Sequence, residues 1–212
     1  WLGTTAGFLQ DKGVEVHVLE ANALNSSWDK VEETIQRTKP ELVFMTGANC
    51  SIDHDVKVAE LAKKVNEKIL TVLYEPTLAP NKPKEILDVF PFVDMVLTGE
   101  PENIVWELCQ KGMNANGIIF REASGSGYVR RDPDPFSIEE LGMPAYNLLP
   151  MNAYDVIYVR YNRGCPYKCT FCTIGSNGSL SALNKTLRFR REDIVIQELK
   201  YLSGLGKRIE FA

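Results

Sequence analysis

Apolar and polar positions between residues 1 and 113 alternate between a helical and a strand-like period. Apolar residues recur every three to four positions over residues 1–10, 28–37, 53–67, 82–89 and 102–111, which predicts helices there. Short apolar runs predict strands over residues 14–19, 42–45, 69–74 and 95–97. Strands separated by helices form mostly parallel, doubly wound sheets. We therefore expect an α/β fold with a Rossmann-like N-terminal domain over residues 1–113, in which the strand before the first helix is missing.

The pattern changes after residue 113. Residues 118–120 and 128–130 flank a Gly- and Ser-rich stretch, which predicts a hairpin. Residues 132–135 and 143–150 are rich in proline, which favours an extended linker, so we assign residues 114–152 to a hairpin and linker. A strand over 156–159, a helix over 192–202 and a strand from 208 onward predict the opening βαβ unit of a second domain, residues 153–212.

The chemistry of the chain is concentrated in three cysteines, Cys165, Cys169 and Cys172, spaced CxxxCxxC just after an apolar strand. Thiolates are soft ligands, and three on one loop can hold three corners of a [4Fe-4S] cluster and leave the fourth iron open. A structural zinc site is the alternative, but zinc sites pair cysteines as CxxC or with histidines, and His17 and His54 lie far from this loop in sequence. Unligated thiols are the other alternative.

This cysteine loop resembles the signature of the radical S-adenosylmethionine (radical SAM) superfamily. The resemblance implies that Cys165, Cys169 and Cys172 ligate a [4Fe-4S] cluster whose open iron chelates S-adenosylmethionine, which is cleaved to a 5'-deoxyadenosyl radical. It also implies that the backbone of Phe171 lies near the adenine, that a ferredoxin or flavodoxin supplies the electron, and that residues 153–212 begin a partial TIM barrel.

A Rossmann-like domain, the linker over 143–150 and then Arg163-Gly-Cys-Pro resemble the cobalamin-binding class of radical SAM enzymes, which includes anaerobic porphyrin-ring cyclases and many C-methyltransferases. Ligands of open parallel sheets bind beyond the carboxyl ends of the strands. The resemblance implies that the corrinoid contacts loop residues there, namely Thr46, Glu75, Thr77, Gly99 and Glu100. Ordinary strand-to-helix turns would also explain these residues.

One feature of that class is missing from this sequence. The cobalt-ligating motif DxHxxG has no match, because neither His17 nor His54 has the required neighbours. In proteins that carry it, the motif follows the first strand, which we expect to be missing here. Cobalamin is therefore implied by the resemblance without a cobalt-ligating histidine in this sequence.

Composition narrows the partners. The 212 residues carry 24 Lys and Arg against 28 Asp and Glu, a net charge of -4, so no basic field favours nucleic acid and we expect a small-molecule substrate. No apolar run reaches the roughly 18 residues of a membrane span. Five cysteines at irregular spacing favour a reducing compartment, so we predict a cytoplasmic protein.

Three functions remain open. The first is a cobalamin-dependent radical SAM transferase or cyclase, catalysing methyl transfer or oxidative ring closure on a small molecule. The second is a methylthiotransferase acting on RNA or protein, but it needs three cysteines for a second cluster and only Cys50 and Cys109 remain. The third is a non-catalytic corrinoid- or cluster-binding module. Both ends of the sequence look cut, so we expect the full-length protein to be the enzyme and this piece to be inactive.

Overall fold

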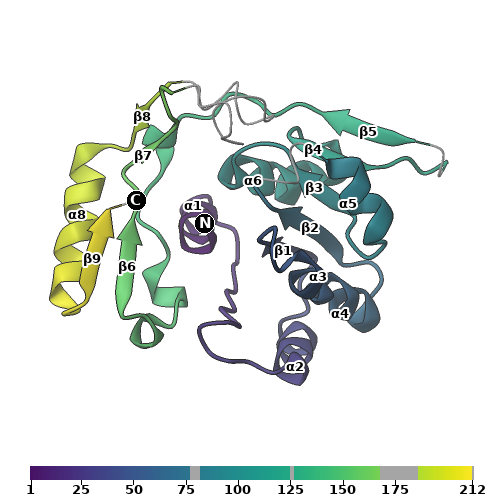
Figure 1. The fold of residues 1–212 in the computed structure, drawn as a ribbon, viewed down its shortest axis with the longest axis horizontal. Coiled ribbons are helices and arrows are strands. Elements are labelled where there is room, and N and C mark those ends of the chain that lie inside the picture. Colours follow the sequence, from purple (N-terminus) through teal and green to yellow (C-terminus); the bar gives the residue numbers. More distant parts are fainter. Residues whose placement is uncertain (77–81, 125–126, 168–185, 212) are drawn as a thin grey trace.

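A computed structural model describes residues 1–76, 82–124, 127–167 and 186–211 (Figure 1). The main sheet has five strands in the order β1-β2-β3-β4-β5. Their bounds are β1 Leu42–Thr46, β2 Leu70–Tyr74, β3 Met95–Leu97, β4 Ile118–Arg121 and β5 Tyr128–Arg131. The helices of this part are α1 Leu2–Asp11, α2 Trp28–Thr38, α3 Ile52–Asp55, α4 Lys57–Val65, α5 Pro83–Val89 and α6 Pro101–Lys111. The predicted α/β fold class is confirmed.

Side chains that alternate along the strands build a separate core on each face of the sheet. Leu73 and Val96 face a cluster that includes residues of α4 and α5. Their neighbours Val72 and Met95 face the opposite cluster, which includes residues of α1 and α6. Because successive strand residues point to opposite faces, strands that are apolar throughout are covered by helices on both sides. β2 and β3 follow this pattern.

The sheet is mixed rather than mostly parallel. β1, β2 and β3 pair in parallel, whereas β4 pairs antiparallel with β3 and β5 antiparallel with β4. The predicted hairpin is therefore present and extends the main sheet by two strands. A short apolar strand followed by a Gly-rich turn does not reveal which edge the hairpin joins, so this placement could not be read from the local pattern.

The prediction of a strand over residues 14–19 is wrong. Val14–Leu19 runs as extended chain without a strand partner, and β1 is the edge strand of the sheet. An apolar alternation becomes a strand only where a neighbouring edge can bond its backbone, and here none is close enough. At this edge position only Met45 among the five residues of β1 is buried.

The single helix predicted over residues 53–67 is divided into α3 and α4 at Val56. Asp55 explains the break. Its carboxylate accepts hydrogen bonds from the Ser51 hydroxyl at 2.8 Å and from the Ala48 amide at 3.0 Å. Local side-chain bonds of this kind stabilise a tight turn in competition with a continuous helix.

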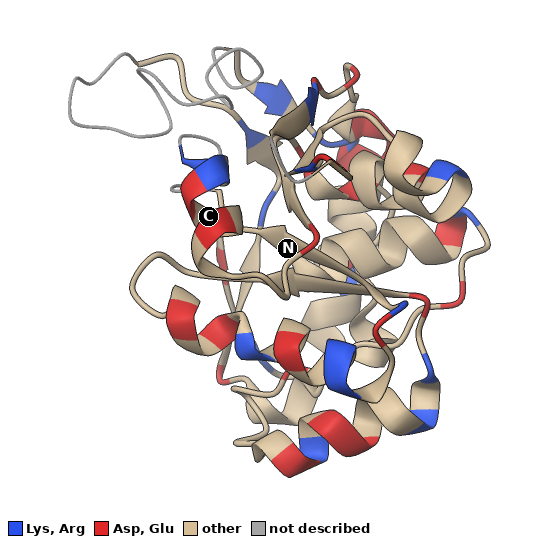
Figure 2. Ribbon diagram, turned by 90° about the vertical axis from the view of Figure 1, so that its right-hand side faces the viewer, with Lys and Arg blue, Asp and Glu red and all other residues tan. Residues whose placement is uncertain are grey.

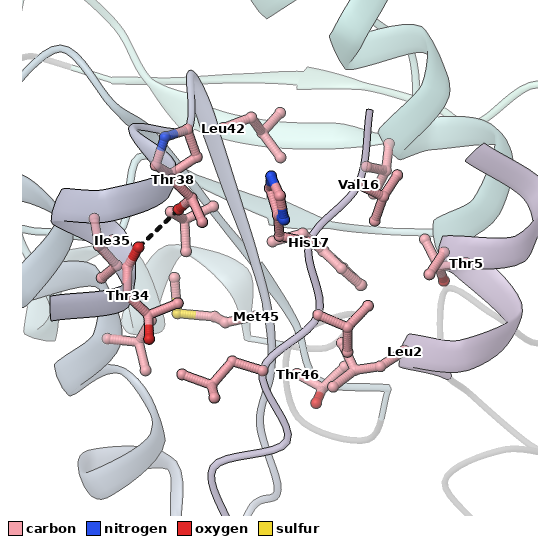
Figure 3. A pocket seen from close by; sticks show the side chains of 18 of the residues that line it. Leu2, Thr5, Val16, His17, Thr34, Ile35, Thr38, Leu42, Met45 and Thr46 are labelled. Atoms are coloured by element: carbon pink, nitrogen blue, oxygen red, sulfur yellow. Dashed lines mark hydrogen bonds between the residues drawn. The ribbon is translucent and has the colours of Figure 1, made fainter. Parts of the chain in front are cut away.

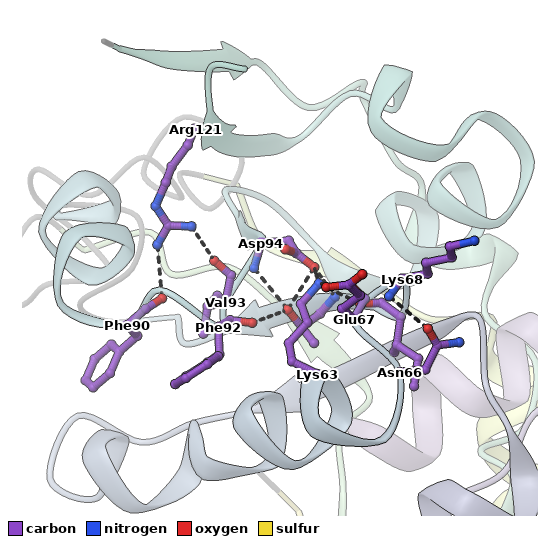
Figure 4. Close-up of polar contacts among 11 residues, drawn as sticks. Lys63, Asn66, Glu67, Lys68, Phe90, Phe92, Val93, Asp94 and Arg121 are labelled. Atoms are coloured by element: carbon purple, nitrogen blue, oxygen red, sulfur yellow. Dashed lines mark hydrogen bonds and ion pairs between the residues drawn. The ribbon is translucent and has the colours of Figure 1, made fainter. Parts of the chain in front are cut away.

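Partly buried polar groups fix the amino ends of β2 and β3 (Figure 4). The Asp94 carboxylate accepts bonds from Lys63 at 2.5 Å and from the Thr71 amide at 2.8 Å, which ties α4 to both strands. On β4, Arg121 donates to the carbonyl oxygens of Leu87, Phe90 and Val93, where α5 ends. These bonds satisfy helix-end carbonyls that would otherwise lack partners.

In the second part of the chain, β6 Val156–Val159 pairs in parallel with β9 Arg208–Phe211. Helix α8 Glu192–Gly204 directly precedes β9 in the chain. A second ladder pairs β7 Asn162–Arg163 with β8 Arg188–Phe189 in antiparallel fashion. The strand–helix–strand order predicted for this part is confirmed. Residues 132–155 connect β5 to β6 and are called the connecting segment below. This segment contains three short 3-10 turns, η2 Ile138–Glu140, η3 Tyr146–Leu148 and η4 Met151–Ala153. A further 3-10 turn, η1 Gly112–Asn114, follows α6.

Helix α1 lies between the main sheet and the β6·β9 unit (Figure 1). The connecting segment crosses it closely, because the Ala145 amide donates to the Gly3 carbonyl at 2.8 Å. At Gly7 an added Cβ would lie 2.2 Å from the Met143 carbonyl oxygen, so only glycine permits this approach. Phe8 of α1 also packs in a buried cluster with Ile138 of the connecting segment.

Charged side chains of both signs are interspersed over the helices (Figure 2). Within the described part of the chain, no helix has the length and apolar character required to cross a membrane.

Candidate functional site: the carboxyl edge of the sheet and the neck of the cysteine loop

The carboxyl ends of the three parallel strands meet at one edge of the main sheet. Thr46 at the end of β1 pairs with Tyr74 at the end of β2, and Glu75 is the next residue after β2. Gly99 and Glu100 follow β3, which is the next strand of the sheet. The sequence-predicted corrinoid contacts Thr46, Glu75, Gly99 and Glu100 are thus brought to one edge. Thr77 lies outside the described residues. Their role toward a corrinoid stays a prediction.

These residues differ in what they offer a ligand. Thr46 is half-buried, while Glu75 is only 2% exposed. Gly99 is packed against the connecting segment, because an added Cβ would lie 2.8 Å from Pro133 Cβ. Beside it, the hydroxyl of the fully buried Thr98 has no hydrogen-bond partner among the described residues. A buried hydroxyl without a partner is costly in a folded protein, and it fits a site that a polar-edged ligand completes.

Two buried carboxylates at this edge are held by arginines from the second part of the chain. Arg163 donates to both oxygens of Glu102, at 3.0 and 2.6 Å. Arg188 donates to both oxygens of Glu100, at 2.9 and 2.8 Å. Arg163 also lies 3.3 Å from Glu100, so the four residues form one network. Paired N–H donors on a carboxylate fix orientation as well as distance.

This network changes the interpretation of the two arginines. A basic side chain beside the cysteine loop could in principle offset the charge of a cluster or bind a carboxylate of a ligand. In the structure both guanidinium groups are directed at Glu100 and Glu102. No local pattern reveals this pairing, because the partners are 61 and 88 residues apart.

Arg163 remains a cation in this environment. Burial lowers its pKa, but the facing carboxylates of Glu102 and Glu100 outweigh burial and raise the pKa above its ordinary value. The guanidinium also lies 4.6 Å from the centre of the Trp1 ring, and that of Arg160 lies 4.7 Å from it. A cation over an aromatic face is further stabilised when it is shielded from water.

The β7·β8 ladder forms the neck of the cysteine loop. It pairs Arg163 with Arg188, so both arginines of the network stand where the loop leaves and returns. Gly164 follows with φ of 98°, a conformation that favours glycine, and the half-buried Cys165 comes next. Cys169, Phe171 and Cys172 lie outside the described residues. The neck therefore fixes the base of the loop to the carboxyl edge of the main sheet.

A second buried network holds the connecting segment to α8. Glu198, 1% exposed, accepts a bond from the Tyr146 hydroxyl at 2.5 Å and one from Arg190 at 2.7 Å. Arg190 also donates to the carbonyls of Gly142 and Arg160. Burial, followed by the bond to Glu198, raises the pKa of Tyr146 well above its ordinary value, so the hydroxyl stays protonated.

The residues fit the implied cofactors as far as they are described. Cys165 would offer one soft ligand beside a fixed neck, and the carboxyl edge would offer polar groups to a corrinoid. Elsewhere in the described residues, no three His, Cys, Asp or Glu side chains are grouped to hold a metal ion. His17 and His54 are mostly exposed, and His54 packs against the ring of Trp28 at 4.8 Å, which agrees with structural roles.

Comparisons with known proteins support this picture. No family model matches the chain. An uncharacterized methyltransferase of Pyrococcus horikoshii is 29% identical over 93% of this chain and 44% of its own length. The anaerobic magnesium-protoporphyrin IX monomethyl ester cyclase of Rubrivivax gelatinosus is 30% identical over 82% of this chain and 34% of its own length. The cobalamin-dependent S-adenosylmethionine radical enzyme OxsB, solved with aqua-cobalamin and S-adenosylmethionine bound, superimposes with a TM-score of 0.81 at 15% identity, over 99% of this chain and 30% of that one.

These matches confirm the resemblance to the cobalamin-binding class of radical SAM enzymes. The OxsB superposition shows the fold alone, and the two sequence relatives extend the likeness to methyltransferases and cyclases. The chain spans less than half the length of each of these proteins. The activity and substrate of a whole protein of the cobalamin-binding class are therefore matters for proposal.

Proposed function

We propose that this chain is part of a cobalamin-dependent radical SAM enzyme that transfers a methyl group to a small molecule or closes a ring on it. In this proposal Cys165, Cys169 and Cys172 hold a [4Fe-4S] cluster, and a corrinoid lies over the carboxyl edge of the main sheet near Thr46 and Glu75. When bound, the cluster with S-adenosylmethionine would supply a carbon-centred radical and the corrinoid a transferable methyl group.

The observation that carries the proposal is the bond between the neck and the edge. Arg163 is two residues before Cys165, and it binds Glu102 at the carboxyl edge where ligands of parallel sheets lie. A loop anchored in this way holds its first thiol at a fixed place relative to that edge. Radical chemistry between two cofactors needs such fixed positioning, because misplacement by about 1 Å can reduce a rate by 10²-fold.

The chain's own residues have three tasks in this mechanism. The buried Glu100 and Glu102 orient the neck through Arg163 and Arg188, and they carry no proton-transfer role. Glu198 fixes the connecting segment against α8, so the two parts of the chain keep one relative placement. The Arg163–Glu102 pair is shielded from water, because its two side chains are 9% and 0% exposed.

Anaerobic reconstitution with iron and sulfide tests the metal site. We expect about four irons per chain and the broad absorbance of a [4Fe-4S] centre, both lost in Cys165→Ala and Cys169→Ala. The matched control is Cys109→Ala, which removes an exposed thiol on α6 and leaves iron uptake unchanged. Colourless protein, or equal iron content in all variants, contradicts the cluster.

Corrinoid retention tests the second cofactor. We expect the chain to retain aquacobalamin through gel filtration and to lose it in Thr46→Trp, a change at the half-buried carboxyl end of β1. A chain that forms the cluster but never retains a corrinoid would point instead to the methylthiotransferase function. The full-length protein with excess reductant would then show the class of reaction, by 5'-deoxyadenosine release with each candidate substrate.

A further inference from the structure

The chain changes its strand partner just before the cysteine loop. β6 pairs in parallel with β9, whereas β7 pairs antiparallel with β8. Arg160 and Tyr161 stand between these two ladders and belong to neither strand. The carbonyl groups of a chain that leaves one ladder need other partners. The direction in which the neck leaves β6 therefore depends on what binds these two residues.

One residue, Arg190, supplies both of those partners. Its amide donates to the Tyr161 carbonyl at 2.8 Å, and its Nη1 donates to the Arg160 carbonyl at 3.1 Å. Arg190 directly follows β8 in the chain. The side of the neck that returns from the cysteine loop therefore binds the side that enters it.

The guanidinium of Arg190 is itself fixed to two other elements. Nη1 also donates to Glu198 of α8 at 2.7 Å, and Nη2 donates to the Gly142 carbonyl of the connecting segment at 2.9 Å. The side chains of Arg190 and Glu198 are 4% and 1% exposed. A guanidinium is planar and does not lose its proton in a protein, so it holds its three acceptors in a fixed geometry.

Stability alone does not account for this arrangement. A buried ion pair is often no more stabilising than apolar side chains of similar volume. In addition, the Nε of Arg190 is buried and has no hydrogen-bond partner among the described residues, which is costly. What this arginine provides is a fixed position for the carbonyl groups of residues 160 and 161.

A small rotation at this point would displace Cys165. Residues 160–165 span at most about 18 Å when extended, so a rotation of about 10° at Tyr161 would move the far end by up to about 3 Å. The β7·β8 ladder contains two residue pairs, and Arg163 and Arg188 attach it to the carboxyl edge of the main sheet. A single attachment acts as a pivot, whereas a second attachment, to α8 and the connecting segment, prevents rotation.

We propose that Arg190 is a positioning residue of the cysteine loop: it stops the neck from rotating and so sets the place of the Cys165 thiol relative to the carboxyl edge. The consequence for a cluster rests on the function proposed above, in which Cys165 is an iron ligand. The placement of the thiol itself can be measured without metal.

Alkylation of the metal-free full-length protein by iodoacetamide measures that placement. Trypsin cleaves after Arg163 and Lys168, so one peptide reports on Cys165 alone, and the exposed Cys50 supplies a reference rate. In Arg190→Met we expect Cys165 to react about 10-fold faster than in the wild type, because the half-buried thiol becomes accessible when the neck is loosened.

Arg190→Lys keeps the test decisive if the methionine variant does not fold. The lysine retains a cation beside Glu198 but offers one nitrogen in place of two, so at least one contact of the guanidinium is lost. We expect this variant to fold and its Cys165 to react about 3-fold faster than in the wild type. A wild-type rate at Cys165 in the folded Arg190 variants overturns the proposal.

Two controls change residues outside these contacts. Arg191→Met removes the neighbouring arginine, whose partner is the exposed Asp193. His17→Ala changes a side chain that lines a cavity of about 980 Å³ beside β1 (Figure 3). Both variants should leave the Cys165 rate within about 2-fold of the wild type. A rate as fast as that of Arg190→Lys in either control would overturn the proposal, because the effect would not be specific to Arg190.

Tyr146→Phe separates position from stability. It removes the bond that the Tyr146 hydroxyl donates to Glu198 and leaves the contacts of Arg190 in place. We expect it to lower the free energy of unfolding without changing the Cys165 rate. If it accelerates Cys165 as much as Arg190→Lys does, loss of stability explains both results and the proposal is overturned.

Loss of iron to a chelator extends the test to the cluster. After reconstitution, we expect a chelator to remove iron about 10-fold faster from Arg190→Lys than from the wild type or Tyr146→Phe. Equal rates of iron loss overturn the proposal. Failure of the wild type to form any cluster contradicts the proposed function instead, and a faster Cys165 reaction in the metal-free Arg190 variants would still support placement of the thiol by Arg190.

Discussion

Glu102→Gln removes one negative charge from the buried network without changing the size of the side chain. Arg163 keeps its charge, because a guanidinium does not lose its proton in a protein and Glu100 still faces it. One of its two bonds to residue 102 must then meet an amide N–H instead of an oxygen. Breaking one partner of a buried ion pair costs about 3–5 kcal/mol. Glu100 still lies 3.3 Å from Arg163, so we expect the lower end, about 3 kcal/mol.

Urea unfolding followed by tryptophan fluorescence measures this loss, and one of the three tryptophans, Trp1, packs over Arg163 and so reports on the network. The control is Glu140→Gln, which removes an exposed ion pair with Lys12 at 3.9 Å and should change stability by less than about 1 kcal/mol. Added salt should affect the control more, since exposed pairs are screened. A loss at Glu102 no larger than that of the control would refute the reasoning, as would unchanged amide exchange in β7 and β8.

Three further predictions concern other parts of the fold. Gly7→Ala should destabilise the chain by about 3 kcal/mol or more, because its Cβ would meet a backbone oxygen at 2.2 Å. Gly204→Ala should stabilise the chain by about 0.5–1 kcal/mol, because its Cβ would have no neighbour within 4 Å. Thermal melting of both variants checks this. Thr98→Val should stabilise the chain without cofactor by about 1 kcal/mol, because it replaces a buried hydroxyl that lacks a partner among the described residues; a loss in urea unfolding would contradict this. The pKa of Tyr146 is raised in the folded state, so its protonated hydroxyl stabilises the fold. This contribution to the free energy of unfolding is fully present below the unfolded pKa of about 10 and falls as pH rises above it. Tyr146→Phe should flatten that fall in unfolding free energy, whereas Tyr158→Phe, on an exposed side chain, should leave its slope unchanged.

The local pattern of apolar and polar residues predicted most of the helices and strands, but it predicted fewer of the pairings between strands. Helices α2, α5, α6 and α8 and strands β1 to β3 begin and end within two residues of their predicted bounds, because apolar periodicity reports burial directly. Residues 14–19 carry the same alternation as a strand, but strand formation also needs a neighbouring edge, which a local pattern does not contain.

The candidate site shows the same limit. The cysteine spacing identified the loop, and the strand ends identified the edge. The pairing of Arg163 with Glu102 joins the two, and it depends on how separate elements pack. From sequence alone a charged side chain is expected to be exposed to solvent. Here four charged side chains are largely buried, and they are stable there only because each forms an ion pair with another, namely Glu100, Glu102, Arg163 and Arg188.

The close crossing of the connecting segment over α1 means that this segment cannot in practice be separated from the part of the chain that forms the main sheet. A chain ended at residue 113 would uncover Phe8 and the backbone of Gly3 and Gly7 along one side of α1. This newly exposed surface of α1 would promote self-association of the shortened chain. Biochemists who want the sheet without the cysteine loop would therefore do better to stop after residue 153 than at the end of α6.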